Sequence, residues 1–182
     1  MRSGVIAVPI KPFSLVGVTE LDAVEGRPTN ECFTGLPWEF RSKDFDKWLP
    51  PDQPDSEARV ITTLTFSGNW KFLERAIAIL GLEESLKPSL VGMLLIEHNY
   101  VLAATQIQAM AEDARRRRKD ASRSKNLFFI RTRSVENPVA VVFIDEDDWS
   151  QLYANIYQLN DGVPWYGHIP LHVPLQKGSR FL

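Results

Sequence analysis

The chain has 182 residues, of which 44% are hydrophobic and 24% are charged. This composition excludes wholesale disorder, and the length predicts a single domain, residues 1–182, that buries a core without help from a disulfide or a metal. The formal net charge of −2 excludes a general attraction to nucleic acid or to an anionic membrane.

Cysteine usage and the apolar runs bear on the compartment. Cys32 is the only cysteine, so no intramolecular disulfide can form and nothing indicates an oxidising environment. Pro9, Lys11 and Pro12 interrupt the first apolar run, which is not typical of a signal peptide. Leu90–Ile96 is far shorter than the ~20 residues that span a membrane. We therefore expect a soluble cytoplasmic protein with no membrane partner.

Residues 1–56 are rich in proline, which divides them into short pieces. We expect them to form strands and loops on a core made by residues 57–182. The turn-rich connection Pro50–Ser56 is expected to be the weakest point of the chain. The other expected elements are strands at Ile6–Ile10 and Phe13–Val18, a loop at Glu25–Pro37 and one helical turn at Asp44–Leu49.

The middle of the chain predicts one strand and then helices. Ala58–Phe66 is rich in β-branched residues and reads as a strand. Asn69 is expected to cap a helix with apolar residues at helical spacing, ended by Gly81. Pro88 suits the first turn of the next helical region, which extends to about Arg118 either as one helix or as two pieces that break near Asn99. The apolar positions are Phe72, Leu73, Ala76, Ile77 and Leu80 in the first helix, and Ala103, Ile107, Met110 and Ala114 in the later part.

The last third predicts a hairpin, a helix and a strand. Leu127–Arg133 and Val139–Ile144 read as two strands joined by a loop. Asp145 is expected to begin an amphipathic helix whose core stripe is Trp149, Leu152, Tyr153, Ile156 and Tyr157. Trp165–Val173 reads as a final strand, placed at a sheet edge because of Pro170. The order of elements predicts an α+β fold, with a largely antiparallel sheet and helices packed on it.

A basic block lies within residues 112–144, which carry a net charge of +5. One interpretation is a phosphate-binding patch. The other, which we favour, is a helix end whose cations complement the helix dipole and neutralise Glu112 and Asp113. The residues of the phosphate-binding alternative are Arg115, Arg116, Arg117, Arg118, Lys119, Arg131 and Arg133.

An acidic run, Asp145, Glu146, Asp147 and Asp148, follows a predicted strand. It reads as a favourable helix start, as part of a metal site, or as a negatively charged docking patch for a basic partner. Trp165 and Tyr166 lie in a Gly/Pro-framed segment and are candidate anchors for that partner, although a structural role in the core fits them as well.

No catalytic motif is recognised. His168 and His172 are four apart in a segment expected to be extended, where they lie too far apart to share a metal ion. Cys32 has Glu31 beside it and reads as a packing thiol rather than a nucleophile. We expect no catalytic residue, no metal and no cofactor, and therefore not an enzyme.

Three short segments carry a family resemblance: G-N-W at Gly68–Trp70, D-E-D-D-W at Asp145–Trp149 and P-W-Y-G at Pro164–Gly167. Together with the mildly acidic α+β character, they resemble the tryptophan-bearing motifs of immunity proteins from bacterial polymorphic and contact-dependent toxin systems. The resemblance implies a protein-binding module that neutralises a toxic enzyme by occluding its active site. Two alternatives stay open: a nucleic-acid- or phosphate-binding accessory protein of phage or mobile-element type, and an enzyme of unrecognised type near Asp145 and His168.

Overall fold

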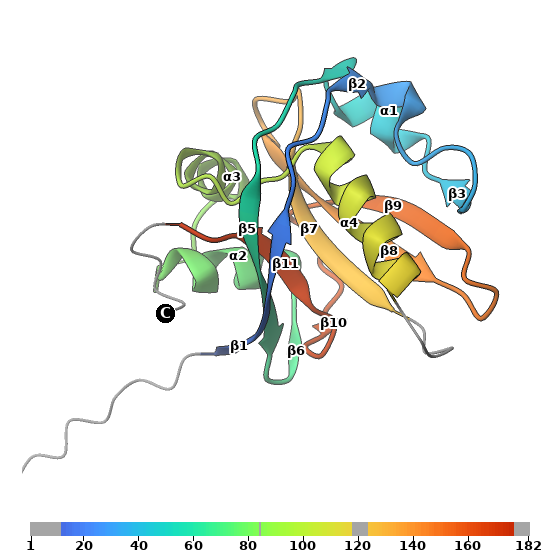
Figure 1. Ribbon diagram of the computed structural model, residues 1–182. Coiled ribbons are helices and arrows are strands. Elements are labelled where there is room, and N and C mark those ends of the chain that lie inside the picture. The colour runs from blue at the N-terminus through green and yellow to red at the C-terminus, as the bar shows by residue number, and fades with distance from the viewer. Residues whose placement is uncertain (1–11, 84, 118–123, 177–182) are drawn as a thin grey trace, which may run out of the picture.

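The computed structural model describes residues 12–83, 85–117 and 124–176, and Figure 1 shows their arrangement. A seven-stranded sheet has the order β1-β5-β11-β7-β8-β9-β3. Within it, β11–β7 and β3–β9 pair in parallel and the other described neighbours are antiparallel. The strands are β1 (Phe13–Leu21), β3 (Trp38–Arg41), β5 (Arg59–Phe66), β7 (Lys125–Arg131), β8 (Val139–Glu146), β9 (Leu152–Gln158) and β11 (Leu171–Pro174).

The remaining elements are short strand pairs and four helices among the described residues. The small strands β2 (Arg27–Pro28) and β4 (Asp52–Gln53) pair with each other, as do β6 (Asn69–Trp70) and β10 (Trp165–Tyr166). The helices are α1 (Asp44–Trp48), α2 (Phe72–Leu80), α3 (Pro88–Glu97) and α4 (Ala104–Arg117). The fold is α+β, as the sequence predicts.

Side-chain alternation along the central strands builds two cores, one on each face of the sheet. In β7, Leu127 and Phe129 pack on the side of α2 and α3, whereas Phe128 and Ile130 pack on the side of α1 and α4. Every residue of β8 except Asp145 is buried. Strands covered on both faces read as continuous apolar runs, which explains why residues 139–144 are entirely apolar.

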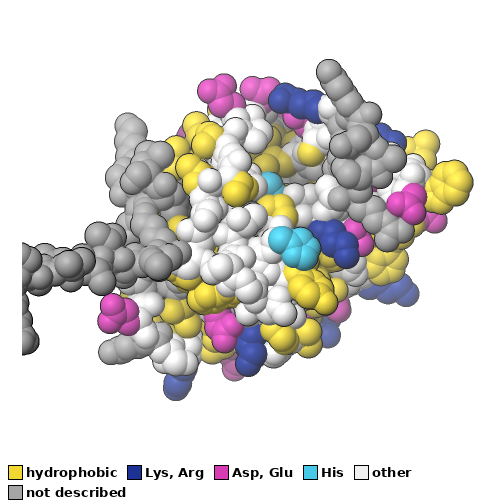
Figure 2. Space-filling model, turned by 90° about the horizontal axis from the view of Figure 1, so that it is seen from below, with side chains coloured by type: hydrophobic (Ala, Val, Ile, Leu, Met, Phe, Trp, Pro, Cys, Tyr) yellow, Lys and Arg dark blue, Asp and Glu magenta, His cyan; other side chains and the backbone are white. Residues whose placement is uncertain are grey.

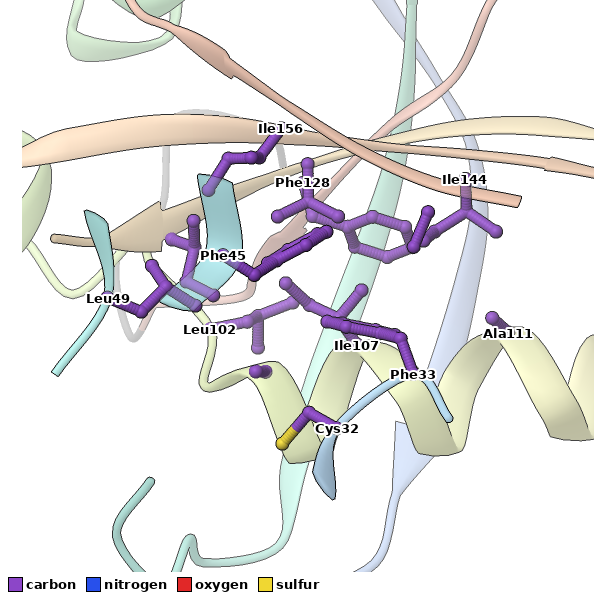
Figure 3. Close-up of a cluster of buried hydrophobic side chains, with 14 of the residues drawn as sticks. Cys32, Phe33, Phe45, Leu49, Leu102, Ile107, Ala111, Phe128, Ile144 and Ile156 are labelled. Carbon is purple, nitrogen blue, oxygen red and sulfur yellow. The ribbon is translucent and has the colours of Figure 1, made fainter. Parts of the chain in front are cut away.

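The α4 side of the sheet holds the cluster of buried hydrophobic side chains in Figure 3. Phe33 packs against Phe45 of α1 with ring centroids 4.9 Å apart, and Ile107 and Ala111 of α4 face the same cluster. Gln53 also ties this layer together, because its side chain accepts a hydrogen bond from the N–H of Ala104 (2.9 Å) at the start of α4. The connection Pro50–Ser56, expected to be the weakest point, therefore carries a buried side chain that caps a helix.

The positions of several expected elements are confirmed. Strand β5 and helix α1 lie where the sequence predicts them, and Gly81 ends α2 in the left-handed conformation (φ 69°). Pro88 begins α3. The helical region breaks after the end of α3, where Asn99 has a positive φ of 55°. Asn69 is not the cap of α2. It lies in β6, and Lys71 occupies the N-cap, where its N–H donates to Glu74 Oε2 (2.8 Å).

The prediction of an amphipathic helix that begins at Asp145 is wrong. Asp145 and Glu146 end β8, a turn follows, and Leu152–Gln158 form β9. The two periods coincide in this segment, since Leu152, Ala154 and Ile156 also alternate as a strand requires. Seven cross-strand pairs with β8, from Glu146↔Leu152 to Ala140↔Gln158, decide in favour of the strand.

The final segment is also not a single edge strand. Trp165–Tyr166 form β10, and β11 lies inside the sheet between β5 and β7. Pro170 is compatible with this position because it precedes β11, where its missing N–H is not needed, while its carbonyl accepts the N–H of Leu127 (2.9 Å).

Two observations complete the description. The strand expected at Ile6–Ile10 lies outside the described residues, as do Arg118 and Lys119. In the described part of the chain, no helix combines the length and the apolar character needed to cross a membrane.

Candidate functional site

The β8–β9 turn is built around the carboxylate of Asp147. Its Oδ1 accepts the N–H groups of Trp149 and Gln151, each at 2.9 Å, and its Oδ2 accepts the hydroxyl of Tyr153 at 3.0 Å. The N–H of Gln151, the Tyr153 hydroxyl and the N–H of Trp149 hold the pKa of Asp147 below its usual range. Asp147 is therefore charged at neutral pH and fixes the conformation of the turn.

This turn presents Trp149 to solvent. The indole is 83% exposed. The backbone of Trp149 is held by its hydrogen bond to Asp147, and the following residue, Ser150, has a positive φ of 59°. Helix α4 holds the turn from outside, since Arg115 Nε donates to the Ser150 carbonyl. An exposed tryptophan on an ordered backbone is the kind of residue that anchors protein interfaces.

Neighbouring strands extend the exposed surface beside the turn. Phe40 of β3 is exposed and pairs with Tyr153 of β9, and exposed Glu39 lies close enough to help raise the pKa of Tyr153, after the hydrogen bond to Asp147 and burial. We call this set the hairpin surface: Glu39, Phe40, Asp147, Asp148, Trp149 and Tyr153. It combines aromatic area with negative charge.

The acidic run does not form one patch. Because Asp145 and Glu146 are strand residues, Asp145 is half-buried opposite Lys125 and Tyr153, and Glu146 is buried opposite Leu152. Only Asp147 and Asp148 lie in the turn. Glu146 therefore does not face solvent. Trp149, which the sequence analysis places on the core stripe of a helix, is exposed instead.

Trp165 and Tyr166 have different environments. The Trp165 ring packs on Phe72, Phe143 and Tyr157 with centroid distances of 5.1–5.2 Å, so it is partly buried against the core. Tyr166 is 63% exposed and stacks on His168 at 5.5 Å. It lies in β10, which Figure 1 shows beside β6 and apart from the β8–β9 turn.

The motifs Gly68–Trp70 and Pro164–Gly167 lie side by side. Trp165 pairs with Trp70 across β6 and β10, and Gly167 lies against the backbone of Phe66 and Gly68. Figure 2 shows the molecule from below, where hydrophobic and histidine side chains reach the surface with charged groups around them. These motifs therefore serve the packing of β6 on β10.

The basic block is divided between the two ends of β7. At one end, Arg115 holds the β8–β9 turn, and Arg116 and Arg117 pair with Asp113, Arg117 Nε at 2.9 Å. Arg131 lies at the other end of β7, and Arg133 lies in the β7–β8 loop beyond it. Six residues of strand separate the two groups by ~20 Å. The helix-end interpretation fits the described arginines of α4.

His172 joins a row of polar side chains across three strands. Its Nδ1 lies 3.0 Å from Thr63 Oγ1 and its Nε2 lies 2.7 Å from Asn126 Oδ1. Since Asn126 Oδ1 can only accept, Nε2 carries the proton and Nδ1 accepts from the Thr63 hydroxyl. Burial lowers the pKa of His172 to about 4, and its ring stacks on Phe128 at 5.0 Å. This order of groups resembles a nucleophilic triad, but the packing fits a neutral structural histidine.

Cys32 is a buried thiol, as expected. Burial, the largest cause, raises the pKa of Cys32 to about 11, and Sγ lies 3.7 Å from the Pro28 carbonyl. Within residues 12–83, 85–117 and 124–176, no group of three or more His, Cys, Asp or Glu side chains is placed to hold a metal ion.

A wide cavity of about 1270 Å³ lies beside the β7–β8 loop. The segment of residues 50–57, the end of α3 and the α3–α4 connection form its other walls. Its charged lining residues are of both signs: Asp52, Asp55, Glu57, Glu97, Arg59, Arg131 and Arg133. This mixture favours no single class of ligand.

Comparison of the chain with protein-family models, with curated proteins and with solved structures finds no significant match.

Proposed function

We propose that the chain is a protein-binding module that acts in the cytoplasm as an inhibitor or immunity protein, occluding the active site of a toxic effector enzyme. The hairpin surface is the docking site, with Trp149 as its central anchor. The observation that carries the proposal is the 83% exposure of Trp149 on a turn whose backbone is fixed by Asp147.

The size of the tryptophan makes this anchor energetically sufficient. Burying an indole removes ~150–250 Å² from water, which corresponds to about 4–6 kcal/mol before the costs of association. Because the Asp147 hydrogen bonds already order the turn, less conformational entropy is lost on binding. One such residue at the centre of an interface accounts for a hot spot of 2 kcal/mol or more.

The charge of the hairpin surface supports a basic partner. Glu39, Asp147 and Asp148 lie on the hairpin surface with its aromatic side chains, and Arg115 contacts the turn through the Ser150 carbonyl. Complementary charge accelerates association and selects the orientation of docking. Enzymes that act on nucleic acid carry basic clefts for the phosphate backbone. An acidic and aromatic hairpin therefore suits the cleft of such an enzyme.

The test first asks whether a gene adjacent to that of this chain encodes an effector domain, and then measures binding to that domain by surface plasmon resonance at two salt concentrations. Trp149→Ser is compared with a matched control, Val135→Ser, which removes an 89% exposed apolar side chain from the other hairpin. We expect Trp149→Ser to weaken binding by about 30-fold or more. Val135→Ser should change it less than two-fold, and the association rate of the wild type should fall as salt rises.

Three outcomes would overturn the proposal. They are no complex with the effector, equal losses in the two variants, and an effector that keeps full activity when saturated with the chain. A parallel titration with duplex DNA examines the nucleic-acid alternative. Binding whose logarithm falls with log salt by about 0.9 per phosphate contact, and which Arg116→Gln weakens, would favour that alternative instead.

A further inference from the structure

A second, smaller cavity lies between α1 and the β7–β8 loop. Its volume is about 390 Å³, within the range of small-molecule sites. It is separate from the hairpin surface, since it reaches β9 at Gln158, the opposite end of that strand from the turn. The lining residues are Lys47, Trp48, Thr132, Arg133, Ser134, Asn137, Val139, Ala140 and Gln158.

Hydrogen bonds fix the walls of this cavity in advance. The N–H of Arg133 donates to the Trp48 carbonyl at 2.9 Å and so attaches the β7–β8 loop to the end of α1. Within the loop, the Thr132 hydroxyl donates to the Asn137 carbonyl, and the N–H of Asn137 donates to Ser134 Oγ at 3.1 Å. A ligand would meet a preformed site and would not have to order the loop.

The charge of the lining is of one sign. Lys47 and Arg133 are both cationic at neutral pH, and no lining residue is acidic. Among the described residues, neither side chain takes part in an ion pair, in contrast to Arg41 of the same region, which pairs with Asp46. Two unpaired cations at the mouth of a partly apolar cavity attract an anion.

The rest of the lining fits a ring. Trp48 is half-buried and lines the cavity, and Ala140, whose side chain lies on the α1 side of the sheet, provides an apolar contact. Ser134, Asn137 and Gln158 add a small number of neutral hydrogen-bonding groups. Apolar walls with a few convergent polar groups are the usual composition of small-molecule sites.

We propose that this cavity binds a small organic anion, a planar ring carrying a phosphate or a carboxylate. Lys47 and Arg133 hold the anionic group, and Trp48 contacts the ring.

The test uses isothermal titration calorimetry with two ring anions, adenosine 5′-monophosphate and indole-3-acetate, each compared with its uncharged form, adenosine or indole. Inorganic phosphate and acetate are the controls for the anion alone. We expect at least one of the two ring anions to bind, and its uncharged form and its anion alone to bind at least ten-fold more weakly. A ten-fold loss from adenosine 5′-monophosphate to adenosine identifies phosphate as a group that the cavity holds, and the same loss from indole-3-acetate to indole identifies carboxylate.

Variants assign the binding to this cavity. Lys47→Gln and Arg133→Gln change exposed side chains and should each weaken binding at least ten-fold. Arg131→Gln is the matched control, because Arg131 is exposed at the base of the same loop but lines only the wide cavity. It should change binding less than two-fold. Binding of adenosine 5′-monophosphate should also quench tryptophan emission, and Trp48→Phe should abolish that quenching.

Two results would overturn the proposal. One is the absence of heat with both ring anions at millimolar concentration. The other is an equal loss in Arg131→Gln and Arg133→Gln. Urea unfolding curves of all variants establish that each is folded, so a loss of binding is not a loss of structure.

Discussion

Arg75 provides the sharpest test of how the fold is held together. Its side chain is 1% exposed, and its guanidinium donates to three carbonyls, those of Ile169 (3.1 Å), Trp165 (3.0 Å) and Tyr166 (2.8 Å). The group also lies 5.1 Å from the centroid of the Phe66 ring. Burial lowers the pKa of Arg75 to about 10, so it is still charged at pH 7. Arg75 therefore attaches the β10–β11 segment to α2.

Replacing Arg75 with methionine keeps apolar volume and removes all three donors. Hydrogen bonds from a charged group contribute ~1.5–3 kcal/mol each, and the loss of the desolvated cation offsets part of that sum. Each of the three carbonyls left without a donor costs ~1–3 kcal/mol, and the relief of the buried charge brings the net loss to about 3–5 kcal/mol. We expect Arg75→Met to lower the free energy of unfolding by that amount. Arg75→Lys should lose less than Arg75→Met, because the ammonium group keeps some of the hydrogen bonds, although it cannot reach all three carbonyls in the same planar geometry.

The assay is urea unfolding followed by tryptophan fluorescence, with slopes compared to establish that the folded states are alike. Arg117→Met on the exposed end of α4 is the matched control and should lose less than ~1 kcal/mol. If Arg75→Met does not fold, Arg75→Lys gives the measurable value. A loss below ~1 kcal/mol in Arg75→Met, or equal losses at Arg75 and Arg117, would refute the reasoning.

Two further predictions concern His172 in the seven-stranded sheet and Gly167 beside the β6–β10 pair. His172 is neutral when folded, with a pKa of about 4, and titrates near 6.5 when unfolded, so stability should fall as pH drops from 6.5 toward 4, by at most about 3 kcal/mol. His172→Gln should flatten that dependence in pH-stepped urea curves; an unchanged slope would contradict it. In Gly167→Ala, the added Cβ would lie 2.0 Å from the Phe66 carbonyl oxygen, so the β6–β10 pair must move and the midpoint of thermal unfolding should fall by several degrees. A midpoint equal to that of the wild type would show that this close approach is not required.

Local chemistry made much of the fold predictable. The β-branched run of β5, the apolar runs of β7 and β8, Gly81 after α2 and Pro88 at the start of α3 each report a preference of the residue itself, and each lies where expected. The candidate site was predictable only in part. The sequence offered Asp147 and Asp148 as docking residues, but it placed them in the first turn of a helix, whereas they lie in the β8–β9 turn.

Other features depend on partners that are distant in the chain. Residues 152–157 satisfy both a helical and a strand period, and pairing with β8 decides between them. The same pairing moves Trp149 from an expected core stripe to the tip of a turn. It also moves Glu146 from solvent into the interior.

The sequence by itself determined the α+β class and the positions of β5, α1 and α2, because these follow from the backbone preferences and burial tendencies of consecutive residues. Only the tertiary structure decided that β11 lies inside the sheet, that Arg75 is buried against three carbonyls and that Trp149 is exposed. Each of these outcomes depends on which segments lie side by side. That choice is made by pairing and packing energies summed over contacts many residues apart, which no local pattern records.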